Sequence, residues 1–261
     1  MTDSAEQAII ELVLPDGLEV ACFNEYETNM LWQEIQGDSP YARAARGLGP
    51  DEVVLDVGAH IGLATLCFAR LLPRTRILSF EPATTMGECL ERNIARHAKN
   101  ATAFRTALGA QVGEREFVYY PHASSKSTLC ADEADNELNL LAFMDGAGFN
   151  DELRALTRRL DEVREHTTVP VTTLSTVFRE HAVDRVGLLK VDVERAELEV
   201  LAGLDEELWP RVRRLLVEVH DRDGALGQAV AMLAGRGYTV EVTKDPAFAG
   251  GTVHMLFARR D

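Results

Sequence analysis

The chain has 261 residues, 46% of them hydrophobic, which is enough for one large α/β domain, or two small ones, with a buried core. Its formal net charge of -15 argues against binding to nucleic acid or to an anionic membrane surface, because both would repel it. No apolar run approaches the roughly 20 residues of a membrane span, and the acidic first residues do not resemble a signal peptide. Four widely spaced cysteines without a CxxC pair predict reduced thiols in a cytoplasmic protein.

The first 50 residues do not share the regular alternation of strand and helix patterns found in the rest of the chain. Residues 9–23 alternate loosely around a Pro-Asp-Gly turn, which predicts a hairpin, and residues 24–35 have a helical pattern. We therefore interpret residues 1–50 as an N-terminal extension that packs on a main domain formed by residues 51–261.

A regular alternation of strands and helices begins at Val53. In one predicted helix Met86, Leu90 and Ile94 recur at four-residue spacing, which is typical of one buried face. Such alternation indicates an α/β fold with a mainly parallel sheet and helices on both faces. The predicted strands are residues 53–57, 76–80, 101–108, 186–192, 214–220, 238–243 and 252–260, and the clearest predicted helices are residues 84–98 and 225–237.

Residues 114–170 interrupt this alternation and are too long for a simple connection. A strand-like run is followed by a polar, irregular stretch and then by a helical pattern, in which Leu153, Leu156, Leu160 and Val163 share one face. We interpret the segment as an insertion over the sheet edge that acts as a lid. A disordered or merely decorative loop is the alternative.

The end of the first strand of the main domain carries a ligand-site pattern. Asp56 lies at the carboxyl end of that strand, where ligands bind in open parallel sheets. Gly58 and Gly62 follow, and glycines allow backbone to approach a ligand closely. The spacing is not the G-x-G-x-x-G of a dinucleotide fold. An aspartate before the turn suits a cationic ligand, such as the sulfonium and ammonium groups of S-adenosylmethionine.

Acidic residues also follow three other strands. Glu81, which precedes Pro82, lies 19 residues after Gly62, where a carboxylate accepts hydrogen bonds from ribose hydroxyls; a surface glutamate before a turn is the alternative. Asp192 ends a later strand and is a candidate functional residue. Glu194 and Glu197 follow it and could simply cap a helix.

The strand at 214–220 ends in Glu218 and His220. A histidine at this edge is a candidate general base, although a lone histidine is often structural. Asp192, Glu218 and His220 could instead hold a divalent metal ion, an interpretation that we do not favour because polar strand ends are common without one.

Together these motifs resemble the FkbM-type methyltransferases, S-adenosylmethionine-dependent enzymes of the class I Rossmann-like fold. The resemblance spans residues 24–243, and its motifs are residues 27–35, 54–62, 80–82, Asn93, 188–203 and 217–220. One departure is Arg195, which stands where the family pattern has glycine. The resemblance implies a cofactor site made by Asp56, Gly58, His60, Gly62, Glu81, Pro82 and Asp192.

The resemblance also implies methyl transfer to a hydroxyl of a small molecule or natural product, such as a polyketide, peptide or sugar, free or tethered to a carrier protein. His220 is our first choice of base and Asp192 the second. Glu194, Glu218 and Ser125 are candidate acceptor contacts. Two other functions stay open: a nicotinamide-dependent oxidoreductase on a related fold, and a non-catalytic cofactor-binding module.

Overall fold

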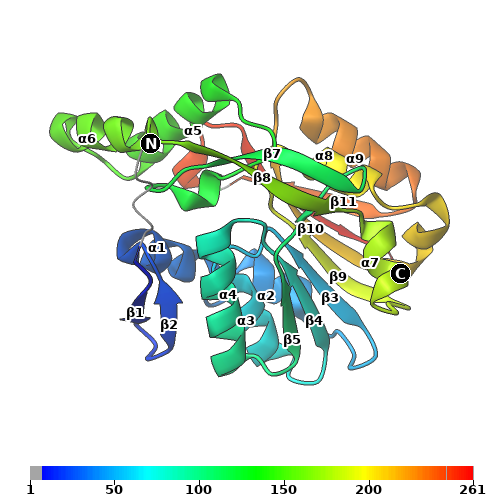
Figure 1. The fold of residues 1–261 in the computed structure, drawn as a ribbon. Helices are drawn as coiled ribbons and strands as arrows, with labels where there is room; N and C mark the ends of the chain where they lie inside the picture. Colours follow the sequence, from blue (N-terminus) through cyan, green and yellow to red (C-terminus); the bar gives the residue numbers. More distant parts are fainter. Residues whose placement is uncertain (1–7, 245, 261) are drawn as a thin grey trace.

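The computed structural model describes residues 8–244 and 246–260. Its centre is a seven-stranded sheet with the strand order β5-β4-β3-β9-β10-β12-β11 (Figure 1). Strand β12 runs antiparallel to both neighbours and the other strands are parallel to one another, as predicted. The strands are β3 (Val53–Val57), β4 (Arg76–Phe80), β5 (Ala101–Phe104), β9 (Val186–Val191), β10 (Arg214–His220), β11 (Thr239–Thr243) and β12 (Val253–Arg259).

Helices cover both faces of this sheet because successive strand residues point to opposite sides. Val54 faces one apolar core and its neighbour Leu55 faces the other. The first core is closed by α1 (Glu25–Ile35), α2 (Pro40–Ala45), α3 (Leu63–Leu71) and α4 (Thr84–His97). The second is closed by α7 (Leu174–Glu180), α8 (Glu197–Ala202) and α9 (Ala225–Gly235). This three-layer arrangement confirms the predicted class I methyltransferase fold.

The predicted helical face of α4 is buried as expected: Met86, Leu90 and Ile94 are at most 8% exposed. No helix in the described ranges is long and apolar enough to cross a membrane. Between residues 8 and 244, Cys22, Cys67, Cys89 and Cys130 are all free thiols, which confirms that part of the sequence prediction.

One buried amide connects the N-terminal hairpin to the main domain. The hairpin consists of β1 (Ile10–Val13) and β2 (Glu19–Cys22) and lies against α4. Asn93 of α4, which is fully buried, accepts a hydrogen bond from Ala21 N (2.7 Å) and donates to Ala21 O (2.9 Å). It also donates to Ile61 O (2.8 Å) in the glycine turn after β3. The hairpin and the turn are therefore held by the same side chain.

The insertion builds a second, smaller sheet with the order β6-β8-β7. Its strands are β6 (Ala107–Leu108), β7 (Gly113–Tyr119) and β8 (Glu165–Thr172), and α5 (Glu133–Gly146) and α6 (Asp151–Asp161) lie between β7 and β8. Short 3₁₀ turns are η1 (Ser124–Lys126), η2 (Glu206–Arg211) and η3 (Pro246–Phe248).

Two details differ from the sequence predictions. The single strand expected at 101–108 is divided into β5 and β6, because β6 leaves the central sheet and pairs with β8. Between them Arg105 turns outward and binds Glu91 of α4 (2.6 Å). The apolar residues of the α6 pattern, Leu153, Leu156, Leu160 and Val163, are 39–51% exposed, since α6 projects from the body of the molecule (Figure 1).

Asn93→Ala should destabilise the fold by roughly 3 kcal/mol, because three buried backbone groups lose their hydrogen-bond partner. Denaturant unfolding measures this free energy. Asn29→Ala is the matched control, since Asn29 is only half-buried and its amide donates to Glu25 O within α1 through a solvent-exposed hydrogen bond. Equal stability of the two variants would contradict the structural role of Asn93.

Candidate active site

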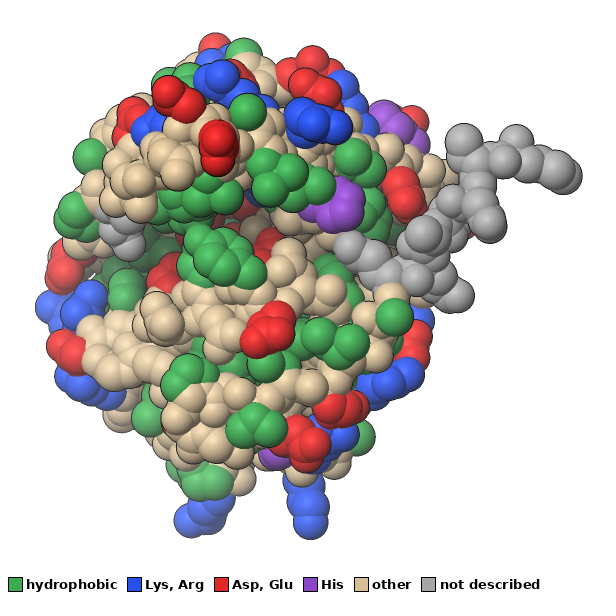
Figure 2. Space-filling model, turned by 90° about the vertical axis from the view of Figure 1, so that its left-hand side faces the viewer, with side chains coloured by type: hydrophobic (Ala, Val, Ile, Leu, Met, Phe, Trp, Pro, Cys, Tyr) green, Lys and Arg blue, Asp and Glu red, His purple; other side chains and the backbone are tan. Residues whose placement is uncertain are grey.

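A cleft lies above the carboxyl ends of β3, β4 and β9, beneath the insertion. Figure 2 shows a hollow in this face of the molecule with acidic side chains visible inside it. The cleft is lined by these predicted site residues: Gly58, His60, Glu81, Pro82, Ser125, Asp192 and Glu194. Four further predicted residues lie outside its lining: Asp56, Gly62, Glu218 and His220. Hydrophobic side chains, among them Tyr41, Phe117 and Leu129, complete the walls.

Neighbouring protein atoms require both glycines of the turn. Gly58 has a φ of +75°, and a Cβ there would lie 1.7 Å from the carbonyl oxygen of Asp192. Gly62 has a φ of +94°, and its Cβ would lie 2.7 Å from Cδ1 of Leu90. Both angles favour glycine. The glycines therefore admit the end of β9 and helix α4, and Gly58 also lines the cleft.

Asp56 lies under the cleft and not in it. Its carboxylate is fully buried, accepts a hydrogen bond from Thr65 (2.6 Å) and lies 3.3 Å from the ammonium of Lys190. We expected this carboxylate to face a cationic ligand; the structure instead pairs it with a cation of the protein.

Lys190 is the residue to which sequence reasoning assigned no role. Its ammonium is 4% exposed, donates to Gly58 O (2.7 Å) and lies 3.2 Å from the carboxylate of Asp192. Burial lowers the pKa of this ammonium, but the charges of Asp192 and Asp56 outweigh burial and raise it. A lysine inside an otherwise apolar strand was the signal in the sequence.

Glu81 occupies the position predicted for ribose recognition. Its two carboxylate oxygens accept hydrogen bonds from the backbone N–H groups of His60 and Ala83, both at 2.9 Å. Burial raises the pKa of Glu81 to about 7, although these two N–H groups act in the opposite direction. Each oxygen keeps a further lone pair, so the carboxylate can still accept from a bound diol.

His60 joins the turn to two other segments. Its Nε2 lies 2.7 Å from the hydroxyl of Ser124, which itself donates to Glu27 (2.6 Å). Because the hydroxyl proton of Ser124 is directed to Glu27, Nε2 of His60 carries a hydrogen and Nδ1 is an acceptor. That Nδ1 has no hydrogen-bond partner within the described part of the chain. Burial lowers the pKa of His60, so the ring is neutral.

Glu27 and Ser124 were missed in the sequence because they lie 97 positions apart. Glu27 also accepts from the backbone N–H of Ser125 (2.9 Å). The insertion is thereby attached to α1 at the cleft wall.

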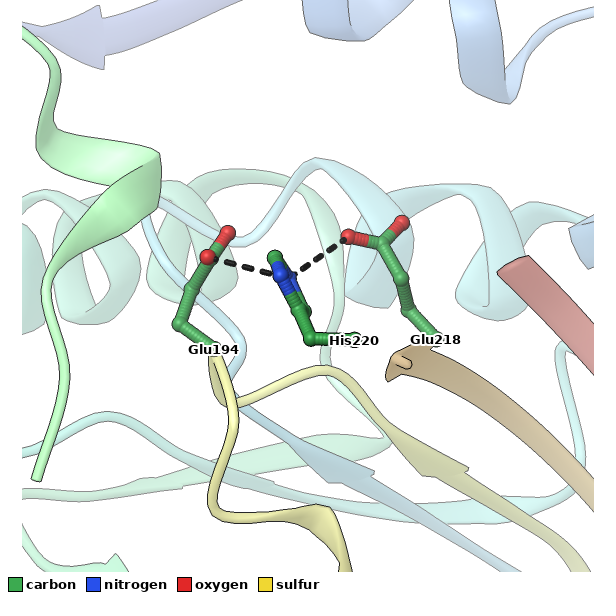
Figure 3. Close-up of side chains that lie close together, drawn as sticks. All are labelled: Glu194, Glu218 and His220. Atoms are coloured by element: carbon green, nitrogen blue, oxygen red, sulfur yellow. Dashed lines mark ion pairs between the residues drawn. The ribbon is translucent and has the colours of Figure 1, made fainter. Parts of the chain in front are cut away.

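His220 is enclosed by acids (Figure 3). Its Nδ1 lies 3.0 Å from Asp135, and its Nε2 lies 3.1 Å from Glu194 and 3.9 Å from Glu218. Burial lowers the pKa of the imidazole, but Glu194 and Asp135 outweigh burial and raise the pKa well above its usual value. His220 is therefore an imidazolium at neutral pH.

The acids around His220 have pKa values shifted in opposite directions. The pKa of Glu194 is lowered despite burial because His220 lies beside it, so Glu194 is ionised. The pKa of Glu218 is raised by burial and by the charges of Asp192 and Glu194, in the opposite direction to that of Glu194. Glu197, which we considered as a helix cap, accepts from the backbone N–H of Arg195 (2.7 Å) at the start of α8.

The residues that could together hold a metal ion differ from the predicted set of Asp192, Glu218 and His220. Ligand atoms of Glu194, Glu218 and His220 lie within 4.8 Å of one another, and Asp192 is not part of this set. The imidazolium already supplies the positive charge that balances Glu194 and Asp135. For this reason we do not assign a metal ion to the group.

Comparisons with known proteins agree with the fold. The sequence model described as "Methyltransferase FkbM domain" matches residues 56–240. The chain is 39% identical to the 31-O-demethyl-FK506 methyltransferase FkbM of Streptomyces tacrolimicus, over 95% of this chain and 96% of that one. It is 35% identical to part of the AMB antimetabolite synthetase AmbE of Pseudomonas aeruginosa, with 99% of this chain matched to 13% of that protein.

Among solved structures, the methyltransferase FkbM from Methylobacillus flagellatus KT is similar in fold, with a TM-score of 0.50 and 13% sequence identity. The match covers 89% of this chain and 58% of that one.

The affinity for S-adenosylhomocysteine should depend on pH through Glu81. The carboxylate accepts ribose hydrogen bonds best when ionised, so affinity should rise as pH increases towards about 7 and then level off. Below that pH it should fall by up to about tenfold per pH unit. Calorimetric titrations with S-adenosylhomocysteine in buffers from acidic to mildly alkaline pH measure this affinity. Glu81→Gln should bind weakly and without this pH dependence; a flat profile for the native protein would exclude the ribose role.

Treatment with a strong chelator, followed by assay in metal-free buffer, should leave methyl transfer from labelled S-adenosylmethionine unchanged. The physical reason is that the His220 imidazolium neutralises Glu194 and Asp135. Loss of activity that is restored by adding a divalent ion would instead assign the Glu194, Glu218 and His220 group to a metal.

Proposed function

Because this chain belongs to the FkbM methyltransferase family, we propose that it transfers a methyl group from S-adenosylmethionine to a hydroxyl of a natural product. One observation supports this most directly: three carboxylates from the ends of two parallel strands of the sheet, Glu81 after β4 and Asp192 and Glu194 after β9, line a single cleft. The name of the Streptomyces relative specifies an O-demethyl substrate, which favours oxygen as the accepting atom. Neither an oxidoreductase nor a non-catalytic module is supported by these matches.

Two residues of the cleft are suited to two parts of S-adenosylmethionine, the ribose and the α-ammonium group. Glu81 would accept hydrogen bonds from the two ribose hydroxyls. The unpartnered Nδ1 of His60 is an acceptor suited to the α-ammonium group. When bound, the cofactor supplies an electrophilic methyl group on a sulfonium and leaves as a neutral thioether.

The chain's own contribution is alignment, exclusion of water and removal of a proton. As the acceptor oxygen forms its bond to the methyl carbon, the C–S bond breaks and its electron pair stays on sulfur. The hydroxyl proton must pass to a base within hydrogen-bond reach. In-line displacement requires that this base lie on the acceptor side of the cleft.

We propose Asp192 as that base, in preference to His220. The side chain of Asp192 is 28% exposed and lines the cleft. His220 is 4% exposed, lies outside the lining and already carries its proton. An imidazolium held by two acids cannot accept a second proton. In this proposal His220 instead holds the carboxylate of Glu194 in place.

We also propose that the insertion at 114–170 is the lid over the acceptor. Phe117, Ser125 and Leu129, all within it, line the cleft, so part of the wall is apolar and suited to a hydrophobic natural product. We propose a hydroxyl acceptor that is either free or tethered to a carrier protein. The acidic charge of the chain disfavours nucleic acid as acceptor.

Asp192→Asn should lower the turnover number by about 10²–10⁴-fold, because the amide cannot accept the hydroxyl proton. His220→Gln should retain most of the turnover. A panel of hydroxylated acceptors with labelled S-adenosylmethionine measures both, and calorimetry with S-adenosylhomocysteine shows whether the cofactor still binds. The base assignment fails if the His220 variant is inactive while the Asp192 variant turns over normally.

A further inference from the structure

Arg195, the departure from the family pattern, has a backbone conformation that favours glycine. Its φ is +75°, and that of the preceding Glu194 is +54°. Two consecutive left-handed residues with side chains are strained, and strain of this kind persists only where other contacts hold it. The side chain of Arg195 is therefore expected to provide compensating contacts.

Those contacts all reach the insertion or the adjoining turn. The guanidinium is 6% exposed; its Nε donates to Cys130 O (2.9 Å) and its Nη1 to Asp135 (3.0 Å). The turn receives a further bond from the insertion, because the hydroxyl of Thr128 donates to Glu194 O. Arg195 thus joins the end of β9 to the segment of the insertion that precedes α5 and to its first turn.

One partner of Arg195 is next to the cleft lining in the sequence. Leu129, which lines the cleft, directly precedes Cys130, and Ser127, which also lines it, lies three positions before Cys130. Asp135 is fully buried and also binds His220 (3.0 Å) and Thr252 (2.6 Å), so it connects α5 to β10 and to the start of β12. A single guanidinium therefore fixes the cleft wall and the acid that orients His220.

We infer that Arg195 is a positioning residue that holds residues 127–135 against the acceptor side of the cleft and so restricts which acceptors enter. The inference rests on the proposed function only in assuming that this side of the cleft binds a methyl acceptor. The attachment itself follows from the contacts of the guanidinium. Glycine at this position would relieve the backbone strain but release the segment.

The test compares Arg195→Gly and Arg195→Lys with the native protein by hydrogen–deuterium exchange. Amide exchange in residues 127–140 should rise about tenfold in the glycine variant, while β3 and β9 remain protected. Lysine should restore protection only in part. Its ammonium lacks the planar, forked set of donors with which the guanidinium binds Cys130 and Asp135 at once. The affinity for S-adenosylhomocysteine should not change, since Arg195 does not line the cleft.

Arg164→Ala is the matched control. Arg164 pairs with Glu133 in the same first turn of α5 (2.6 Å), but on the surface and away from Asp135. The Arg164→Ala variant should leave amide exchange in residues 127–140 unchanged. With an acceptor found in the labelled-methyl panel, Arg195→Gly should raise KM for that acceptor about tenfold and leave KM for S-adenosylmethionine unaltered.

Unchanged amide exchange in both Arg195 variants would overturn the inference. It would also be overturned if Arg164→Ala raised exchange in residues 127–140 as much as Arg195→Gly does. Should the glycine variant fail to fold, the lysine variant decides by the same exchange measurement. If the native protein methylates no acceptor, the proposed function is in question, but the exchange result still decides whether Arg195 holds the segment.

Discussion

The cleft depends on one buried ammonium, that of Lys190. Three acceptors surround it: Asp56 on β3, the carbonyl of Gly58 in the following turn, and Asp192 after β9. Removing a lysine charge from water costs several kcal/mol, and this arrangement offsets that cost only if all three acceptors stay in place. Lys190 therefore sets the relative position of two strand ends and of the turn between β3 and α3, where the cofactor is proposed to lie.

A second constraint is the number of carboxyl groups around this cation. The chain carries 42 Asp and Glu residues against 27 Lys and Arg, and several of the acids converge on the cleft. They cannot all be ionised in a buried site. Glu81 and Glu218 have raised pKa values, whereas Glu194 is ionised beside the His220 imidazolium. Such separation of pKa values suits the acids to different roles: Glu81 is proposed to bind the ribose, and Glu194 balances the charge of His220.

Several polar contacts attach the insertion to the main domain. Among them, Glu27 of α1 binds Ser124, and Arg195 binds Cys130 and Asp135. Ser125, Ser127 and Leu129, which line the cleft, lie between Ser124 and Cys130 in the sequence. These hydrogen bonds therefore hold that part of the cleft wall on the main domain.

The amino-acid sequence by itself determined the sheet, the helices and the row of acids at strand ends. Periodicity of apolar residues is local, and parallel strands place their carboxyl ends along one edge. Glu81 and Asp192 could therefore be assigned to the cleft in advance. Only the tertiary structure decided which acids face the cleft. Asp56 is in register with Lys190 on the neighbouring strand, and that pairing directs its carboxylate away from any ligand.

The role of His220 was decided in the same way. Its position at a strand end suggested a base, but Asp135, 85 residues earlier, and Glu194 turn it into a buried cation. Charge state depends on neighbours brought together by folding, and no local pattern contains them. Arg195 shows the same limit. The sequence marked it as a departure from glycine, and only its contacts with Cys130 and Asp135 explain how a side chain is tolerated there.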